Sequence, residues 1–97
     1  MFVKKIEEYV VQYSSNRFPP RIWLKAEGKY LGTQLVFKSN GTILPPDTQM
    51  SIYYHLDDFQ NIIDILRNEK PVYLSWVGPN SENGIRTAPE PIGEEED

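Results

Sequence analysis

The chain contains no cysteine, and this absence excludes disulfide bonds, thiol nucleophiles and the zinc sites that cysteines build. It has a single histidine and scattered acidic residues, without the spacing of a zinc or calcium site. No hydrophobic run approaches the roughly 20 residues that a membrane-spanning helix requires. The six glycines stand apart at turn positions and form no phosphate-binding loop. We therefore expect no metal, no cofactor and no membrane span.

The chain has the composition of a single globular domain, with 97 residues of which 39% are hydrophobic and 25% charged. Its charge is uneven, because residues 94–97 are four consecutive acids. Without these four, the 14 acids fall to ten and balance the ten lysines and arginines. We expect one domain over residues 1–93 and a disordered acidic tail over residues 94–97. The first residues lack a signal-peptide pattern, so the expected location is cytoplasmic.

Alternating hydrophobic and polar residues predict a series of short strands. The clearest cover residues 21–27, 30–38, 49–56 and 72–77, and a short edge strand is expected near residues 85–88. Residues 2–13 combine helical spacing with many residues typical of strands, and we expect a strand there. Two pairs of residues predict tight turns, Gly28–Lys29 and Asn40–Gly41.

One amphipathic helix is expected over residues 57–69, with Asp57 capping its first turn and Gln60 completing a capping box. Pro71 ends it. The strands on either side of this helix would run parallel if they were neighbours, as a right-handed β-α-β unit. The predicted fold is α+β: a mixed, mostly antiparallel sheet of five or six strands with one helix on one face, with the option of curling toward a partial barrel.

The sheet face opposite the predicted helix carries aromatic and basic side chains, whereas a solvated sheet face should be polar. Strand register places on it Trp23, Tyr30, Val36, Tyr53, His55 and Tyr73, with Arg21, Lys25 and Lys38 around them. Three explanations compete. The face is a second core, covered by the N-terminal segment or by curling of the sheet; it is an interface with a protein partner or a second copy; or it stacks nucleobases or a planar ligand.

Only His55 with Asp57 and the adjacent Asp58 resembles an acid–base pair. The aspartates already suit a helix start, His55 is expected on the solvent side, and no nucleophile motif accompanies them. We therefore expect no enzymatic activity, and keep His55 and Asp57 as the only catalytic candidates.

Three segments resemble the C-terminal half of a group of small bacterial proteins with no assigned activity. They are HLDDF, LRNEKPVYL and EPIGEE, which fall within residues 50–96. This resemblance implies a bacterial, cytoplasmic protein and no site residue. We expect a non-enzymatic module that binds a protein partner, or itself, through the aromatic face or an exposed strand edge. The alternative is a binder of single-stranded nucleic acid or a small planar ligand on the same face, which the balanced charge and the acidic tail disfavour.

Overall fold

The computed structural model describes residues 1–88, and within them the chain forms seven strands and one α-helix. The strands are β1 (Phe2–Ile6), β2 (Glu8–Gln12), β3 (Arg21–Ala26), β4 (Lys29–Lys38), β5 (Ser51–His55), β6 (Val72–Trp76) and β7 (Gly84–Thr87). A 3₁₀ turn (Leu56–Asp58) leads into helix α1 (Phe59–Asn68). The expected α+β fold is confirmed. The expected acidic tail, residues 94–97, lies outside the described residues.

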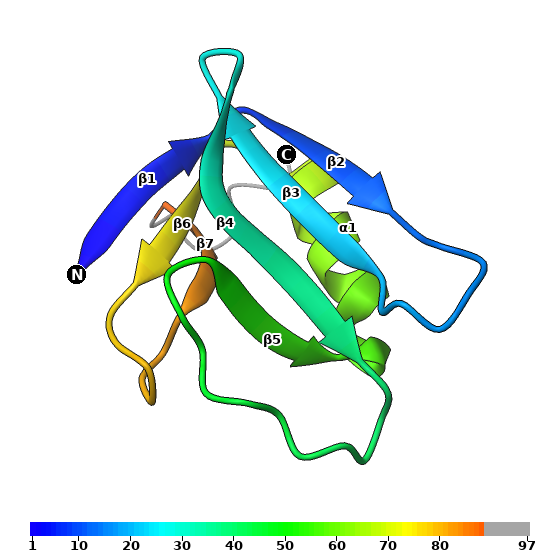
Figure 1. The fold of residues 1–97 in the computed structure, drawn as a ribbon. Coiled ribbons are helices and arrows are strands. Elements are labelled where there is room, and N and C mark those ends of the chain that lie inside the picture. Colours follow the sequence, from blue (N-terminus) through cyan, green and yellow to red (C-terminus); the bar gives the residue numbers. More distant parts are fainter. Residues whose placement is uncertain (89–97) are drawn as a thin grey trace, which may run out of the picture.

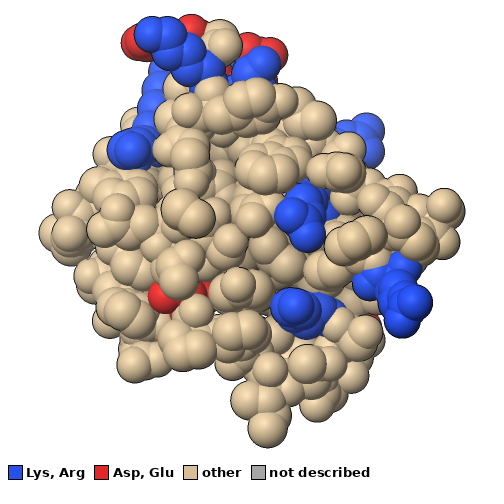
Figure 2. Space-filling model, viewed as in Figure 1, with Lys and Arg blue, Asp and Glu red and all other residues tan. Residues whose placement is uncertain are grey.

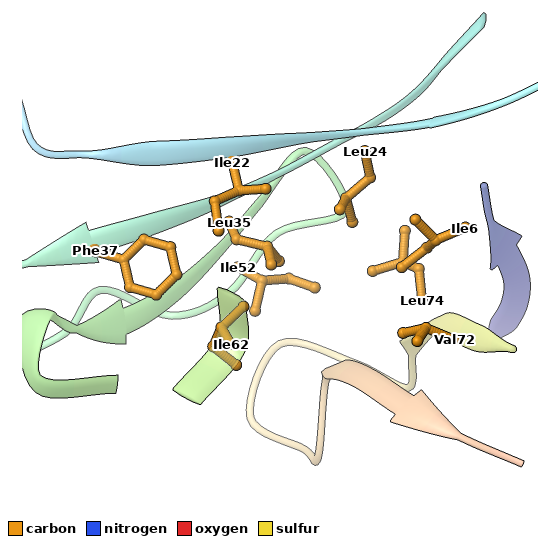
Figure 3. Close-up of a cluster of buried hydrophobic side chains, with 9 residues drawn as sticks. All are labelled: Ile6, Ile22, Leu24, Leu35, Phe37, Ile52, Ile62, Val72 and Leu74. Carbon is orange, nitrogen blue, oxygen red and sulfur yellow. The ribbon is translucent and has the colours of Figure 1, made fainter. Parts of the chain in front are cut away.

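The strands form two sheets rather than one, with strand orders β2-β3-β4-β5 and β1-β6-β7 (Figure 1). Helix α1 and the three-stranded sheet lie on the same face of the four-stranded sheet, and the core fills the space between these two layers. Figure 3 shows Phe37 and Ile62 at the helix end of this core, and Ile6, Val72 and Leu74 at the other end. The opposite face of the four-stranded sheet is the one turned to the viewer in Figure 1.

The alternation of side chains along the strands sets which face of each strand is buried. In β3, Ile22 and Leu24 are fully buried while Trp23 between them is only half-buried. In β6, Val72 and Leu74 are buried in the same way. The predicted strand phases are therefore confirmed for these strands, as is the strand character of the N-terminal segment. That segment is divided between β1 and β2, which belong to different sheets.

The predicted β-α-β unit is wrong, because β5 and β6 lie in different sheets. The parallel pair is β4 with β5, joined by residues 39–50, which contain no helix. On its second edge, β5 is hydrogen-bonded to residues 47 and 48 instead of to another strand of residues 1–88. The backbone N–H of Tyr53 donates to the Asp47 carboxylate at 2.9 Å. Strand β6 instead pairs antiparallel with β1 and β7.

The predicted capping of the helix by Asp57 is also wrong. The first helical turn is the 3₁₀ turn, and neither it nor α1 has a side-chain cap. Asp57 is instead paired with Asn40: its carboxylate accepts from the Asn40 amide at 2.8 Å, and its backbone N–H donates to the Asn40 side-chain oxygen at 2.9 Å. Gln60 donates forward to Asp64 at 2.9 Å rather than back to the cap.

The β3–β4 hairpin turns one residue earlier than predicted. Ala26 pairs with Lys29, so the two turn residues are Glu27 and Gly28. Both have positive φ, 53° and 75°, as a type I′ turn requires. Glu27 adopts this conformation although it is not glycine, and its backbone N–H donates to the Glu7 carboxylate. The carboxylate of Glu7, at the corner between β1 and β2, thereby anchors the hairpin.

Candidate functional site

The candidate site is the face of the four-stranded sheet that points away from the core, which we call the back face. On β3, β4 and β5 it is formed by Arg21, Trp23, Lys25, Tyr30, Gln34, Val36, Lys38, Ser51, Tyr53 and His55. Strand pairing aligns these side chains in rows, such as Arg21 beside Val36 and Val36 beside Tyr53. Figure 2 shows lysine and arginine side chains spread over an otherwise uncharged surface, with acidic atoms at the top and at one lower spot of the view.

Contacts between neighbouring side chains hold the basic and aromatic groups of the back face in place. The Lys25 ammonium lies 5.0 Å from the centre of the Tyr30 ring, and the Lys38 ammonium 5.9 Å from that of Tyr53. The Trp23 and Tyr30 rings meet edge to face at 6.0 Å. These distances are typical of cation–π and T-shaped aromatic contacts. These contacts restrict the positions of the rings and of the lysine ammonium groups.

A row of polar hydrogen bonds crosses the same face. The Arg21 guanidinium donates to the Gln34 side-chain oxygen at 3.1 Å, and the Gln34 amide donates to the Ser51 hydroxyl at 3.0 Å. The Trp23 indole N–H donates to the Gln12 side chain of β2 at 3.1 Å. Each of these bonds restricts a side chain that is otherwise free to rotate.

No strand or helix of residues 1–88 lies over the back face (Figure 1). The explanation that the N-terminal segment covers it is wrong, because β2 extends the sheet beside β3 instead of crossing it. Tyr30 is 59% exposed, and Trp23, Tyr53 and His55 are half-buried among their neighbours. Only Val36 is buried, at 4% exposure. Within the described residues, the back face is thus free of covering strands and helices, and the segment between β4 and β5 contacts it on β5, at Tyr53 and His55.

Tyr73 does not belong to this surface, which corrects the prediction from the sequence. It lies in β6, where it is aligned with Lys5 of β1 and Arg86 of β7 on the outer side of the three-stranded sheet. Its phase relative to Val72 and Leu74 was predicted correctly. Phase along a strand does not reveal which sheet the strand joins, and this is why Tyr73 was grouped with the others.

His55 and Asp57 both bind the segment that connects β4 with β5. His55 Nε2 lies 2.8 Å from the Thr42 carbonyl oxygen, which requires this nitrogen to carry a proton. Asp57 is paired with Asn40, as described above. The two candidates are therefore engaged separately, and both fix the connecting segment. Among residues 1–88, no cluster of three or more histidines and acids could hold a metal ion.

Sequence reasoning missed a polar link between the loops of the two sheets. Besides its bond to β5, the Asp47 carboxylate accepts from the Asn83 amide at 3.1 Å. The Asn83 side-chain oxygen accepts from the backbone N–H groups of Val77 and Gly78, at 2.7 and 3.2 Å. Turn signals were present at Pro45–Pro46–Asp47 and at Asn83–Gly84, but nothing in the sequence indicates that they meet.

The back face is a sheet surface, whereas a hollow of about 700 Å³ lies elsewhere, between the β1–β2 corner and the end of α1. Lysine, arginine and glutamate side chains line this hollow, and it presents charges of both signs. Ligand pockets are mostly apolar and enclosed. The hollow therefore lacks the lining expected of a small-molecule site.

No protein-family model matches the chain, and no curated protein or solved structure matches it either. None of the helices within residues 1–88 is long and apolar enough to cross a membrane. The resemblance of residues 50–96 to small bacterial proteins stays an expectation.

Proposed function

We propose that this protein is a non-enzymatic interaction module that binds a protein partner through the back face. The observation that carries the proposal is the combination found there: aromatic rings and bases, no acid on β3, β4 or β5, and no covering strand or helix from residues 1–88. Aromatic side chains and arginine contribute most to the energy of protein interfaces. A surface of this composition, with its side chains held by neighbouring contacts, is suited to another protein surface.

The charge of the back face specifies the chemistry of the partner. Arg21, Lys25 and Lys38 present positive charge, and the nearest acid in the strand pairing is Glu8, opposite Lys25 on β2. Complementary potentials speed association and suppress wrong partners. We therefore propose a partner whose surface combines aspartate or glutamate side chains with apolar groups that pack against Trp23 and Tyr30.

Single-stranded nucleic acid is the second candidate, since it also binds to lysine and arginine side chains and to aromatic rings. Stacking of a nucleobase needs a free ring face. The Lys25 and Lys38 ammonium groups already lie over the rings of Tyr30 and Tyr53. A nucleobase that stacks on the lysine-covered face of Tyr30 or Tyr53 would have to displace the ammonium group, whereas a carboxylate can bind the ammonium groups where they are. The observed geometry therefore favours a protein.

We also propose a cytoplasmic location, which the resemblance of residues 50–96 implies.

The proposal is tested by affinity capture from a bacterial lysate with matched variants. The test variant combines Trp23→Ala with Lys25→Glu on the back face. The control combines Tyr73→Ala with Lys5→Glu, a tyrosine and a lysine aligned with each other on the outer side of the other sheet. We expect proteins that are retained by the wild type and the control to be lost from the test variant. Equal retention by all three proteins would contradict the proposal, provided circular dichroism shows each of them folded.

Tryptophan fluorescence separates the two candidates. Trp23 lies on the back face, whereas Trp76 is buried at 6% exposure. A single-stranded oligonucleotide that binds the back face should quench Trp23, with an effect that weakens as salt is added. We expect no such quenching. Salt-sensitive quenching that disappears in Trp23→Phe would replace the protein partner by nucleic acid.

A further inference from the structure

Strand β2 is an edge strand with one side unpaired. It pairs with β3 along its whole length, and no other strand of residues 1–88 pairs with it. In an antiparallel pair, the backbone groups of alternate residues point away from the partner strand. The outer edge of β2 therefore offers N–H donors and C=O acceptors to another strand.

The other sheet edges in residues 1–88 carry features that hinder pairing, and β2 does not. Strand β1 has Lys4 and Lys5. Strand β7 has only four residues, one of them Arg86. On the edge of β5, the backbone N–H groups of Tyr53 and Ser51 are already bonded to Asp47 and Thr48. Lysine, short length and covering loops are common ways to block edge-to-edge association.

By contrast, β2 reads EYVVQ, with no base and no proline. Its two valines, Val10 and Val11, are each 41% exposed. Exposed β-branched residues on an unprotected edge favour the addition of a strand.

We infer that β2 pairs antiparallel with β2 of a second copy of this chain, about a two-fold axis at Val10. In this register Val10 faces Val10 of the second copy, Tyr9 faces Val11, and Glu8 faces Gln12. No like charges are opposed, and β-branched and aromatic side chains, which stabilise cross-strand pairs, meet along the strand. The edge is thus complementary to itself, as a two-fold interface requires.

The paired strands join two four-stranded sheets into one continuous sheet. Val10 is aligned with Trp23, which lies on the back face. The two-fold axis at Val10 therefore passes next to the back-face side chains of both copies. The two back faces then form one surface. Self-association itself requires no partner and is independent of the binding role proposed above. A typical stable interface buries roughly 800 Å² on each partner and involves about 20–30 residues a side. Strand β2 contributes only five residues to the strand pairing. We therefore expect the dimer to dissociate on dilution.

Sedimentation velocity of the full chain over a wide concentration range tests this inference. We expect the wild type to shift from monomer to dimer as concentration rises. Val10→Lys places two lysines on the axis and should raise the dissociation constant roughly tenfold or more. The matched control is Val3→Lys, which adds the same charge to the edge strand β1, where Val3 is 49% exposed. It should dimerise as the wild type does.

A mixture of Val10→Lys and Val10→Glu tests the register, because opposite charges then meet on the axis. We expect the mixture to dimerise more strongly than either variant alone. A wild type that stays monomeric at all concentrations would overturn the inference. Equal dimerisation of Val10→Lys and the wild type would do the same, and a mixture that stays as monomeric as its components would overturn the pairing about Val10.

Discussion

Replacing Gly84 by alanine should strongly destabilise the fold, because no space exists for a side chain there. A Cβ atom built on Gly84 would lie 2.2 Å from the Tyr54 hydroxyl oxygen, and the φ of Gly84 is +141°, which L residues rarely adopt. The backbone strain costs about 1–3 kcal/mol, and forcing an extra methyl group into a packed site costs a similar amount. We therefore expect Gly84→Ala to lower the free energy of unfolding by about 4 kcal/mol.

A double-mutant cycle with Tyr54→Phe isolates the steric part of this loss. Tyr54 stacks on Phe37 at 5.5 Å, and its hydroxyl lies near the backbone of Ile85, which opposes in part the rise in its pKa caused by burial. Tyr54→Phe keeps the ring stacking and should cost about 1 kcal/mol for the lost polar contacts of the hydroxyl. Without the hydroxyl, the nearest ring atom is 3.4 Å from the added Cβ.

The double variant should then be about 2 kcal/mol more stable than the sum of the two single losses predicts. Urea denaturation of all four proteins measures this coupling. If the two losses simply add, the contact between Gly84 and the Tyr54 hydroxyl is not the cause, and the reasoning is refuted.

Further predictions concern pH, the hairpin and the loop link. Burial raises the pKa of Tyr54 from 10.0 to about 12. The neutral hydroxyl therefore contributes fully to the free energy of unfolding below pH 10, and this contribution is lost as pH rises through 12. Relative to Tyr54→Phe, the wild type should lose about 2–3 kcal/mol of its free energy of unfolding when denaturation is measured at increasing alkaline pH. An equal dependence of the free energy of unfolding on pH in both proteins would contradict this. Glu27→Asn should stabilise by up to about 1 kcal/mol, because asparagine tolerates positive φ better; a lower melting temperature would contradict it. Asp47→Ala should lower the free energy of unfolding by about 2 kcal/mol, because it leaves the backbone N–H of Tyr53 without its hydrogen-bond acceptor. An unchanged midpoint of urea denaturation would contradict this.

Local patterns in the sequence were sufficient to predict the buried sides of β3, β6 and α1. The alternation around Ile22 and Leu24 and the apolar stripe of the helix, which includes Ile62, each require only neighbours along the chain. These residues are buried as expected. The pattern is informative because a strand or helix must bury one face wherever it lies in the fold.

The distribution of strands between the sheets could not be predicted in this way. It depends on pairings between distant segments, such as β1 with β6 and the bond from Tyr53 to Asp47. Trp23, Tyr30 and Tyr53 were placed on one face correctly, because β3, β4 and β5 do pair. Tyr73 was misplaced because β6 does not join them.

Site-specific photo-crosslinking inside cells tests the binding role of the back face most directly. Benzoylphenylalanine replaces Tyr30, which is 59% exposed on the back face, or Tyr73, which lies on the other sheet. We expect irradiation to link the protein substituted at Tyr30 to a discrete partner, and the protein substituted at Tyr73 to give no such product. Capture from the Tyr73 position alone, or from neither position, would contradict the back face as the binding surface.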